Sequence, residues 1–403
     1  VAMNSLGMNI ARSVGPALGG MIVAAAGAAS AFTLNAMSYL GLIGVLLTWK
    51  QEKEKPRLKE GLRTAMAAGV RYVALSPPVR TVLARALLVG LAASAVPSLL
   101  PLVASDLLRG EAATFGFLSG GFGIGAVIGA LSNRSIRNHL SSETIVRLAL
   151  ISLIFGAVIV SQSRYLALSL FGLVFCGAGW ILAIATMNVS VQMSVPRWVV
   201  GRAMSLFQMF VFGSMAVGSF AAGRLSEIYS VEDALLIMAA MQSVSLLAGL
   251  VLKLPKNEDE NLDPSGRWKM PELKVDVTPR SGPVHVTIRY QIAKADLAEF
   301  LATMKTRRRI RMRDGARGWT LSQDLQEPDV WIEHYRFGRW RDYILHNERQ
   351  TVADVPSLAV LRRLHQGDQP PEVHRTLGRP VNGKILDPDT IYDDAIIDPT
   401  RGS

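Results

Sequence analysis

Residues 165–191, YLALSLFGLVFCGAGWILAIATMNVSV, decide the fold, because they form a long apolar stretch without one charged side chain. A bilayer core about 30 Å thick is crossed by a helix of about 20 apolar residues. Similar stretches lie before and after this one, at 5–25, 29–49, 83–105, 113–132, 144–162, 203–223 and 232–253. The sequence therefore predicts eight membrane-spanning helices within residues 1–255.

The composition agrees with a membrane protein that carries a soluble part. Hydrophobic residues make up 50% of the 403 residues, and the mean hydropathy is +0.27. Such values are high for an ordinary soluble domain. The apolar runs end near Leu254–Pro255, and residues 256–403 have the composition of a soluble domain.

The positive charge is concentrated in the membrane part. Residues 1–255 hold 19 basic and 9 acidic residues, whereas residues 256–403 hold 24 and 23. The basic residues gather in the linker 50–80 and in alternate loops after it, as expected for loops that face the cytoplasm. We therefore expect an integral protein of the bacterial inner membrane with a cytoplasmic C-terminal domain, in contact with the lipid bilayer and not with nucleic acid.

The single cysteine excludes a disulfide and a cysteine metal site within the chain. Cys176 is the only cysteine, and it lies inside an apolar span. One cysteine cannot form a disulfide within the chain, and a buried thiol is most often a small packing residue. We expect no metal site and no cofactor.

An internal repeat explains the number of spans. The pair Gly15 and Gly20 in the first span recurs as Gly218 and Gly223 in the seventh, about 203 residues later. Two six-helix halves of about 200 residues give such an offset. The spans 5–25 and 29–49 are then the last two helices of a first half, and we expect four further helices before Val1.

The segment Ala2-Met-Asn-Ser-Leu6, followed by Arg12-Ser-Val-Gly15-Pro16-Ala-Leu-Gly19-Gly20, resembles the fifth helix of the major facilitator superfamily, in its enterobactin-exporter-like branch of transmembrane secretion effectors. The resemblance covers residues 1–255 and implies an all-α polytopic membrane protein with a major facilitator fold. It also implies secondary-active export of small organic molecules, siderophore-like or drug-like, by alternating access.

Gly15-Pro16-x-x-Gly19-Gly20 is similar to the antiporter motif of that family. Pro16 bends a helix, and the glycines permit a close helix contact that hinders ion leak. A packing kink without a coupling role explains the motif equally well. Arg12 lies one turn earlier and either binds an anionic group or extends to the membrane interface.

A second motif lies at the end of the fourth span. Gly129, Asn133, Arg134 and Arg137 resemble the signature loop of the family, in which an acidic residue pairs with basic ones to latch one side. Asn133 replaces that acid. The loop is therefore either a weakened gate or a positively charged anchor.

Trp180, Asn188 and Gln192 are the candidate residues of a substrate cavity in the sixth span. Facing a neighbouring helix, they would instead join helices through hydrogen bonds.

The segment 256–403 predicts a linker at 256–274, a domain at 275–380 and a disordered tail at 381–403. The order of strand and helix patterns is βαββαβ, which indicates a soluble α+β ferredoxin-like domain. This order resembles a dimeric α/β-barrel module of the antibiotic-biosynthesis-monooxygenase type, which implies self-association. His334, Tyr335, Trp340, Tyr343 and His346 cluster in sequence without catalytic or metal spacing, so we interpret them as packing residues.

The complete prediction has six parts: 1–49 as the last two helices of the first half, 50–82 as a cytoplasmic linker, 83–255 as a complete six-helix second half, then 256–274, 275–380 and 381–403 as above. The function expected first is export, with no catalytic residues and a tail that regulates or dimerises. The alternative is a monooxygenase-type enzyme tethered to a carrier. A third hypothesis is a membrane scaffold that does not transport.

Overall fold

The computed structural model describes residues 29–30, 32–48, 62–255, 261–266, 268 and 270–379. The chain divides into two compact units. The first, here called the span unit, comprises Val1–Arg57, Pro78–Ser194 and Ala203–Asn257. The second, here called the tail unit, comprises Leu58–Pro77, Val195–Arg202 and Glu258–Ser403.

The span unit contains helices long and apolar enough to cross a membrane. Six are found among the described residues, which confirms the six predicted for 83–253: Pro77–Leu107, Ala113–His139, Ser142–Gln162, Leu166–Met193, Val200–Ile228 and Val231–Val251. A shorter apolar helix, Phe32–Thr48, matches the predicted span 29–49. The predicted span 5–25 lies outside the described residues.

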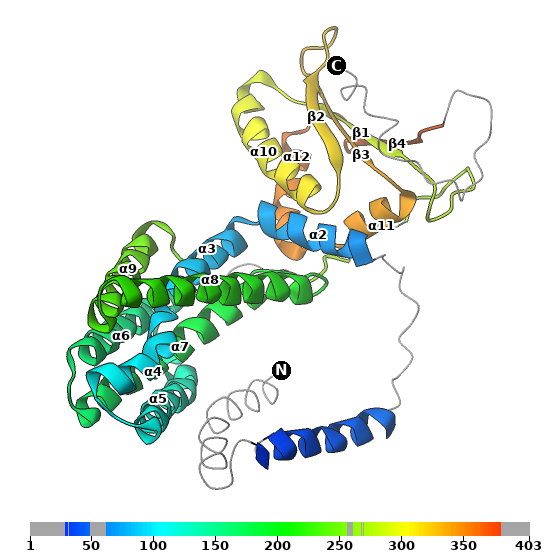
Figure 1. Ribbon diagram of the computed structural model, residues 1–403. Coiled ribbons are helices and arrows are strands. Elements are labelled where there is room, and N and C mark those ends of the chain that lie inside the picture. Colours follow the sequence, from blue (N-terminus) through cyan, green and yellow to red (C-terminus); the bar gives the residue numbers. More distant parts are fainter. Residues whose placement is uncertain are drawn as a thin grey trace. The chain divides into compact units, whose positions relative to one another are not determined.

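The first of the six spans is one helical run of 31 residues in three segments (Figure 1). It consists of α3 (Pro77–Ala93), α4 (Ala95–Leu102) and a π-helical turn, η1 (Val103–Leu107). Pro97 and Pro101 lack the backbone N–H that a helix interior uses, so a bend in this region is expected. The other five are single helices: α5 (Ala112–His139), α6 (Ser142–Gln162), α7 (Leu166–Met193), α8 (Val200–Ile228) and α9 (Val231–Val251).

Helix ends follow ordinary capping chemistry. The side chain of Ser141 accepts a hydrogen bond from the Thr144 N–H at the start of α6. Ser230 does the same for Asp233 at the start of α9. Serine oxygens in this position satisfy backbone donors that lack a partner in the first helical turn.

Glycines let α7 approach two neighbours closely. A Cβ atom added at Gly125 or Gly129 of α5 would meet the backbone of α7 at Val174 or Ala178. On another side of α7, Gly172 meets Gly156 of α6. Small residues at such contacts allow backbones to pack directly, which is how helices associate in lipid.

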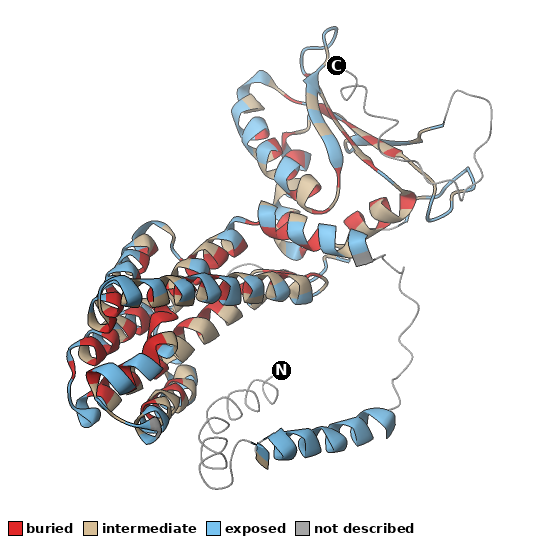
Figure 2. Cartoon of the chain, in the orientation of Figure 1, coloured by how far each residue is buried: buried red, intermediate tan, exposed pale blue. Residues whose placement is uncertain are grey.

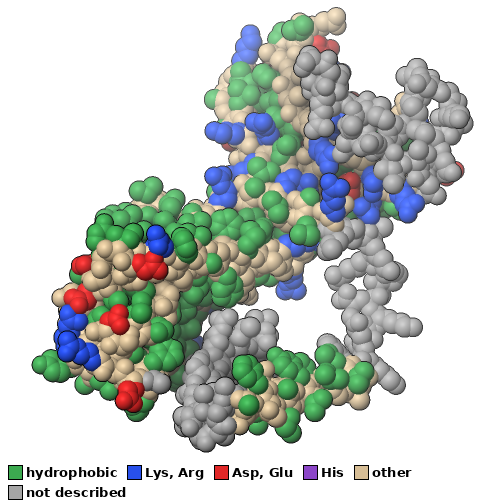
Figure 3. All heavy atoms as spheres, viewed as in Figure 1, with side chains coloured by type: hydrophobic (Ala, Val, Ile, Leu, Met, Phe, Trp, Pro, Cys, Tyr) green, Lys and Arg blue, Asp and Glu red, His purple; other side chains and the backbone are tan. Residues whose placement is uncertain are grey.

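The outer surface of the span unit is apolar. Large hydrophobic side chains such as Phe117, Leu131, Phe171 and Phe220 are exposed on its helices, and Figure 2 shows exposed residues along these helices. Figure 3 shows hydrophobic side chains over much of the visible surface of this unit. In water such a surface would be unfavourable, whereas acyl chains cover it at no cost.

The tail unit contains a four-stranded antiparallel sheet. Its elements are β1 (Val284–Gln291), α10 (Leu297–Arg313), β2 (Arg317–Gln323), β3 (Val330–Phe337), α11 (Trp340–Glu348), α12 (Val355–Leu364) and β4 (Glu372–Leu377). The strand order is β2-β3-β1-β4. The central pair is in register from Val284 opposite Phe337 to Gln291 opposite Val330. The element order agrees with the βαββαβ pattern of the sequence.

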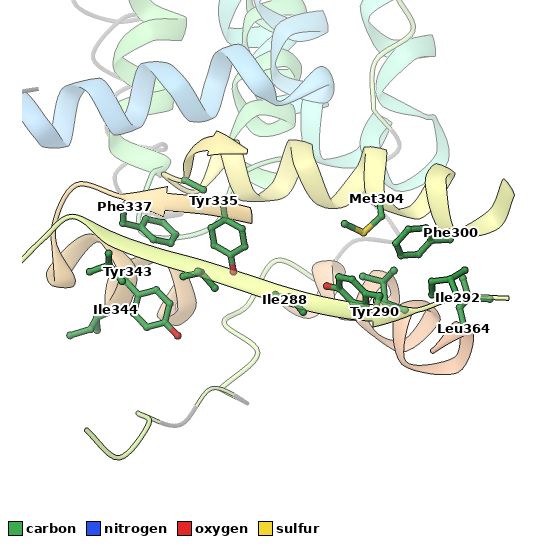
Figure 4. Close-up of a cluster of buried hydrophobic side chains, with 14 of the residues drawn as sticks. Ile288, Tyr290, Ile292, Phe300, Met304, Tyr335, Phe337, Tyr343, Ile344 and Leu364 are labelled. Carbon is green, nitrogen blue, oxygen red and sulfur yellow. The ribbon is translucent and has the colours of Figure 1, made fainter. Parts of the chain in front are cut away.

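One face of this sheet forms the core of the tail unit. Alternate residues of β1, from Val284 to Tyr290, are buried, and their neighbours are less so. Figure 4 shows Tyr290, Phe300 and Met304 near one end of this core and Phe337 and Tyr343 near the other. The helices α10, α11 and α12 supply the opposing apolar side chains.

Two segments that lie between spans in the sequence also belong to the tail unit. One is α2 (Leu62–Leu75), a helix within the predicted linker. Its residues Ala68, Tyr72 and Val73 are buried at helical spacing. The other, here called the loop Val195–Arg202, comprises the connection after α7 and the first three residues of α8, and its Val195 and Val199 are buried.

Candidate functional site

A buried charge network joins α3, α6 and the end of α9 in the span unit. Arg85 of α3 is completely buried, with 0% of its surface exposed. Its Nη1 donates to Glu143 Oε1 at 3.3 Å and to the Leu252 carbonyl oxygen at 3.1 Å. The Ser141 cap places Glu143 in the first turn of α6.

Glu143 gathers two further donors. Arg147, one turn later on α6, donates from Nε to Glu143 Oε1 at 2.8 Å. The backbone N–H of Leu254 donates to Glu143 Oε2 at 2.9 Å. Arg147 Nη2 also reaches the Gly249 carbonyl oxygen of α9, at 3.3 Å. One carboxylate thus links the middle of α3 to the start of α6 and the end of α9.

Gly249 provides the space for this arrangement. A Cβ atom there would overlap the Arg85 guanidinium group. Arg85 Nε and Nη2 have no hydrogen-bond partner among the described residues. A buried cation that depends on one carboxylate is costly to leave unpaired, so Glu143 is essential to this part of the bundle.

Arg85 and Glu143 were not among the residues predicted from the sequence. Arg85 lies within the predicted span 83–105, and Glu143 directly precedes the predicted span 144–162. A basic residue inside an apolar run was the available signal. Its partner could not be identified, because α3 and α6 are 58 residues apart at this contact.

The predicted antiporter motif lies outside the described residues: Arg12, Gly15, Pro16, Gly19 and Gly20. Of the second motif, Gly129 packs against Ala178 of α7. Asn133 is half-buried, and its Oδ1 has no partner among the described residues. Arg134 is exposed and Arg137 half-buried, and neither forms an ion pair within the described ranges.

The three cavity candidates all lie on α7, at different depths. Trp180 is half-buried near the middle of this helix, which runs from Leu166 to Met193. Asn188 and Gln192 lie near its end, where the Gln192 side-chain amide donates to Asn188 Oδ1. The structure therefore pairs two of the candidates with each other and leaves Trp180 at mid-depth.

A small pocket lies where α3 and α4 meet α6 and α9. Its lining includes Ala93, Val96, Leu153 and Met238, and its one polar member is Gln242. Gln242 is 2% exposed, and neither atom of its amide has a partner in the described part of the chain. One amide is too little to orient a polar organic molecule, so the pocket does not resemble a substrate site.

The tail unit contains a second buried polar network, centred on Glu333. Its carboxylate accepts from Trp319 Nε1 at 2.9 Å, from the Tyr290 hydroxyl at 2.9 Å and from Arg311 Nε at 3.4 Å. Burial would raise the pKa of Glu333, but Arg311 and Arg307 lower it below the ordinary value. Glu333 is therefore ionised and fully hydrogen-bonded.

His346 accepts a hydrogen bond from Arg311 Nη1 at 2.9 Å. An arginine can only donate, so this ring nitrogen carries no proton. Burial, and then Arg311 and Arg307, lower the pKa of His346 well below its ordinary value. The imidazole is therefore a neutral acceptor inside the core.

The residues that cluster in the tail sequence separate onto two sides of the sheet. Tyr335, Trp340, Tyr343 and His346 are buried in the core, as the packing interpretation expects. His334 is half-buried on the other face, where it contacts Thr287. No three potential metal ligands come together within the described ranges.

Comparison with known proteins identifies relatives over most of the chain. A family profile described as transmembrane secretion effector matches residues 1–381. The enterobactin exporter EntS of Escherichia coli O1:K1 / APEC is 28% identical over 237 residues. The EntS proteins of Escherichia coli O45:K1 (strain S88) and Shigella boydii serotype 18 give the same identity over the same length. The matched region is 56% of this chain and 53% of each relative, so the chain spans about half the length of these curated relatives.

Proposed function

The chain belongs to the transmembrane secretion effector family of major facilitator transport proteins, and on this premise we propose that it forms part of a secondary-active exporter of small organic molecules. The observation that carries the proposal is the bundle of six apolar helices of spanning length in a chain that is similar to exporters.

The proposed cargo is siderophore-like or drug-like. The relatives are named enterobactin exporters, and the half-buried Trp180 at the middle of α7 would offer an aromatic surface to such a molecule. Arg12 and the Gly15-Pro16-x-x-Gly19-Gly20 motif would supply anion contact and a tight helix seal in the first half.

The proposed orientation places the tail unit in the cytoplasm. Basic residues lie at the ends of spans on the side from which the tail emerges, in agreement with the positive-inside rule. They are Arg134, Arg137, Arg197, Arg202 and Lys253. The number of spans between its parts is consistent with all of the tail unit lying on the same side of the membrane. Four spans separate α2 from Val195–Arg202, and two separate that loop from the tail, both even numbers.

We propose that the domain 275–380 has a ferredoxin-like fold and associates with a second copy of itself. The strand order β2-β3-β1-β4 supports that fold. The sheet face opposite the core is only partly exposed at His285, Thr287 and His334, and it is the surface available for pairing.

Export can be tested with inside-out membrane vesicles that carry the protein expressed from its natural reading frame. With a proton gradient imposed, we expect enterobactin or ethidium to accumulate in these vesicles. Arg12→Ala should abolish the accumulation, whereas Arg224→Ala, at an exposed position beyond the proposed pathway, should not. Equal accumulation in vesicles without the protein would refute the proposal.

A further inference from the structure

The tail unit holds two segments that lead directly into spans. Five residues define what we call the three-way junction: Arg71 and Tyr72 of α2, Trp198 of the loop Val195–Arg202, and Arg313 and Arg349 of the C-terminal domain. These residues come from three parts of the chain that are far apart in the sequence.

The contact to α2 combines an aromatic ring with a helix cap. Tyr72 is 2% exposed, and the Arg313 guanidinium carbon lies 5.0 Å from the centre of its ring. Arg71 Nε donates to the Arg313 carbonyl oxygen, the last carbonyl of α10, at 3.3 Å. A cation at this position complements the partial negative charge of a helix C-terminus.

Two carboxylates fix Arg313 in place for this contact. Its Nε donates to Asp314 at 2.8 Å, and its Nη2 donates to Asp354 at 2.9 Å. The side chain of Arg313 is only 13% exposed. The surface that receives α2 is therefore preformed by residues of the C-terminal domain.

Trp198 brings the second segment to the same place. Its ring meets Tyr72 edge to face, with the ring centres 5.6 Å apart. The Arg349 guanidinium carbon lies 3.9 Å from the centre of the Trp198 ring. Stacked cations and edge-to-face rings attract each other, so the loop is bound to both α2 and the C-terminal domain.

The two held segments continue into helices that touch each other. Helix α2 ends at Leu75 and α3 begins at Pro77, whereas the loop Val195–Arg202 runs into α8. Within the span unit, a Cβ atom at Gly90 of α3 would overlap Ser214 of α8. One at Gly218 of α8 would overlap the Leu91 carbonyl oxygen of α3. The junction thus gathers the leading segments of a packed helix pair.

We propose that the C-terminal domain is a clamp, whose binding partners are α2 and the loop Val195–Arg202 of its own chain. The clamp holds the starts of α3 and α8 in one arrangement and restrains their movement. The inference that this restraint regulates transport rests on the proposed function. In alternating access, the helices of one transporter half move against the other half.

Hydrogen exchange of the whole protein in lipid nanodiscs tests the binding. In Trp198→Ala, we expect the amides of α2 to exchange roughly tenfold faster, because two ring contacts are lost, while β1 and β3 keep their protection. Arg349→Gln, which removes the stacked cation but keeps the Trp198–Tyr72 contact, should give a smaller change in the same segment. Tyr165→Ala, at a 75% exposed aromatic residue of another loop, is the matched control. Unchanged exchange of α2 in both junction variants would overturn the proposal.

Spin labels test the restraint on the helices. Labels at Arg80→Cys and Ser205→Cys, in a Cys176→Ser background, report the starts of α3 and α8. We expect one narrow distance distribution, which broadens when Trp198→Ala is added. A distribution that stays narrow would refute the clamp, even if export is observed. Broadening without any cargo accumulation would support the clamp and count against the proposed function.

Discussion

At the scale of single residues, Arg85 links the middle of α3 to the start of α6 and the end of α9. Its guanidinium group is removed from water and lipid alike, and Glu143 is the carboxylate that balances its charge. Breaking a buried ion pair from one side leaves an uncompensated charge, which is far more costly than losing an exposed pair.

Glu143→Gln should therefore destabilise the span unit by about 3–5 kcal/mol. Cys176 is buried between α7 and α6, and as the only cysteine it reports unfolding through reaction with a thiol-specific dye in detergent. Glu232→Gln removes the exposed ion pair with Arg164 and should cost about 1 kcal/mol or less. Equal shifts of the two melting temperatures would show that the Arg85 network does not stabilise the bundle.

The buried His346 should make the unfolding free energy of the tail unit depend on pH. Its pKa is lowered on folding, so the unfolded chain binds a proton near pH 6.5 that the folded chain does not. The unfolding free energy of the tail should therefore fall as the pH drops below about 6.5. Glu333, whose pKa is also lowered, should add a further loss below about pH 4.5.

Urea unfolding followed by tryptophan fluorescence measures this dependence. In His346→Gln, which retains an acceptor for Arg311, the slope between pH 6.5 and 5 should decrease strongly. A small slope of the same sign should remain, because burial and His334 lower the pKa of His285. An unaltered slope in His346→Gln would contradict the assignment.

At the scale of elements, glycines determine how closely α7 packs. Gly125 of α5 lies directly against the backbone of Val174, whereas Gly120 on the same helix has no heavy atom near its missing side chain. The two positions therefore form a matched pair for substitution by alanine.

Gly125→Ala should destabilise the span unit by about 1–3 kcal/mol, because α5 must move away from α7. Gly120→Ala should be neutral or slightly stabilising, since alanine favours a helix. Thermal unfolding read through Cys176 compares them directly. If both substitutions had the same effect, close backbone packing would not be the role of Gly125.

The sequence predicted most elements and missed those that depend on distant partners. Apolar stretches such as 165–191 identify spans because a bilayer requires about 20 apolar residues in a row. The periodicity of the tail likewise predicted its strands and helices. Helix α2 was missed within the basic linker 50–82, because its buried stripe is short and only Trp198 and Arg313 complete it.

The candidate site residues also divide into those that the sequence suggested and those that depend on distant partners. Motif resemblance selected Gly129, Asn133, Arg134 and Arg137, whose role as a gate stays a prediction. Trp180, Asn188 and Gln192 stay predictions as cavity residues, although the structure joins Asn188 and Gln192 by a hydrogen bond. The Arg85–Glu143 pair could not be predicted, since no pattern in one sequence relates residues 58 positions apart.

At the scale of the whole molecule, the face of the tail-unit sheet opposite the core is partly exposed among the described residues and is the candidate surface for association. We expect the protein to form dimers in nanodiscs through the face that carries His285, Thr287 and His334. Thr287→Arg would place like charges opposite each other in a symmetric pair and should shift the population to monomers. Mass photometry measures this shift, with Thr303→Arg on the exposed side of α10 as the control. Dimers that persist in Thr287→Arg would exclude this face.

The three-part composition of the tail unit also bears on biosynthesis. A ribosome releases α2 first, the loop Val195–Arg202 next and β4 last, so this unit closes only after all six described spans have been threaded. An inverted or skipped span would strand α2 or the loop on the wrong side of the bilayer. Its C-terminal domain would then emerge without the contacts of Arg313 to Tyr72 and of Arg349 to Trp198. Closure of the tail unit therefore requires that the spans between its three parts be inserted in the orientation that brings those parts to one side.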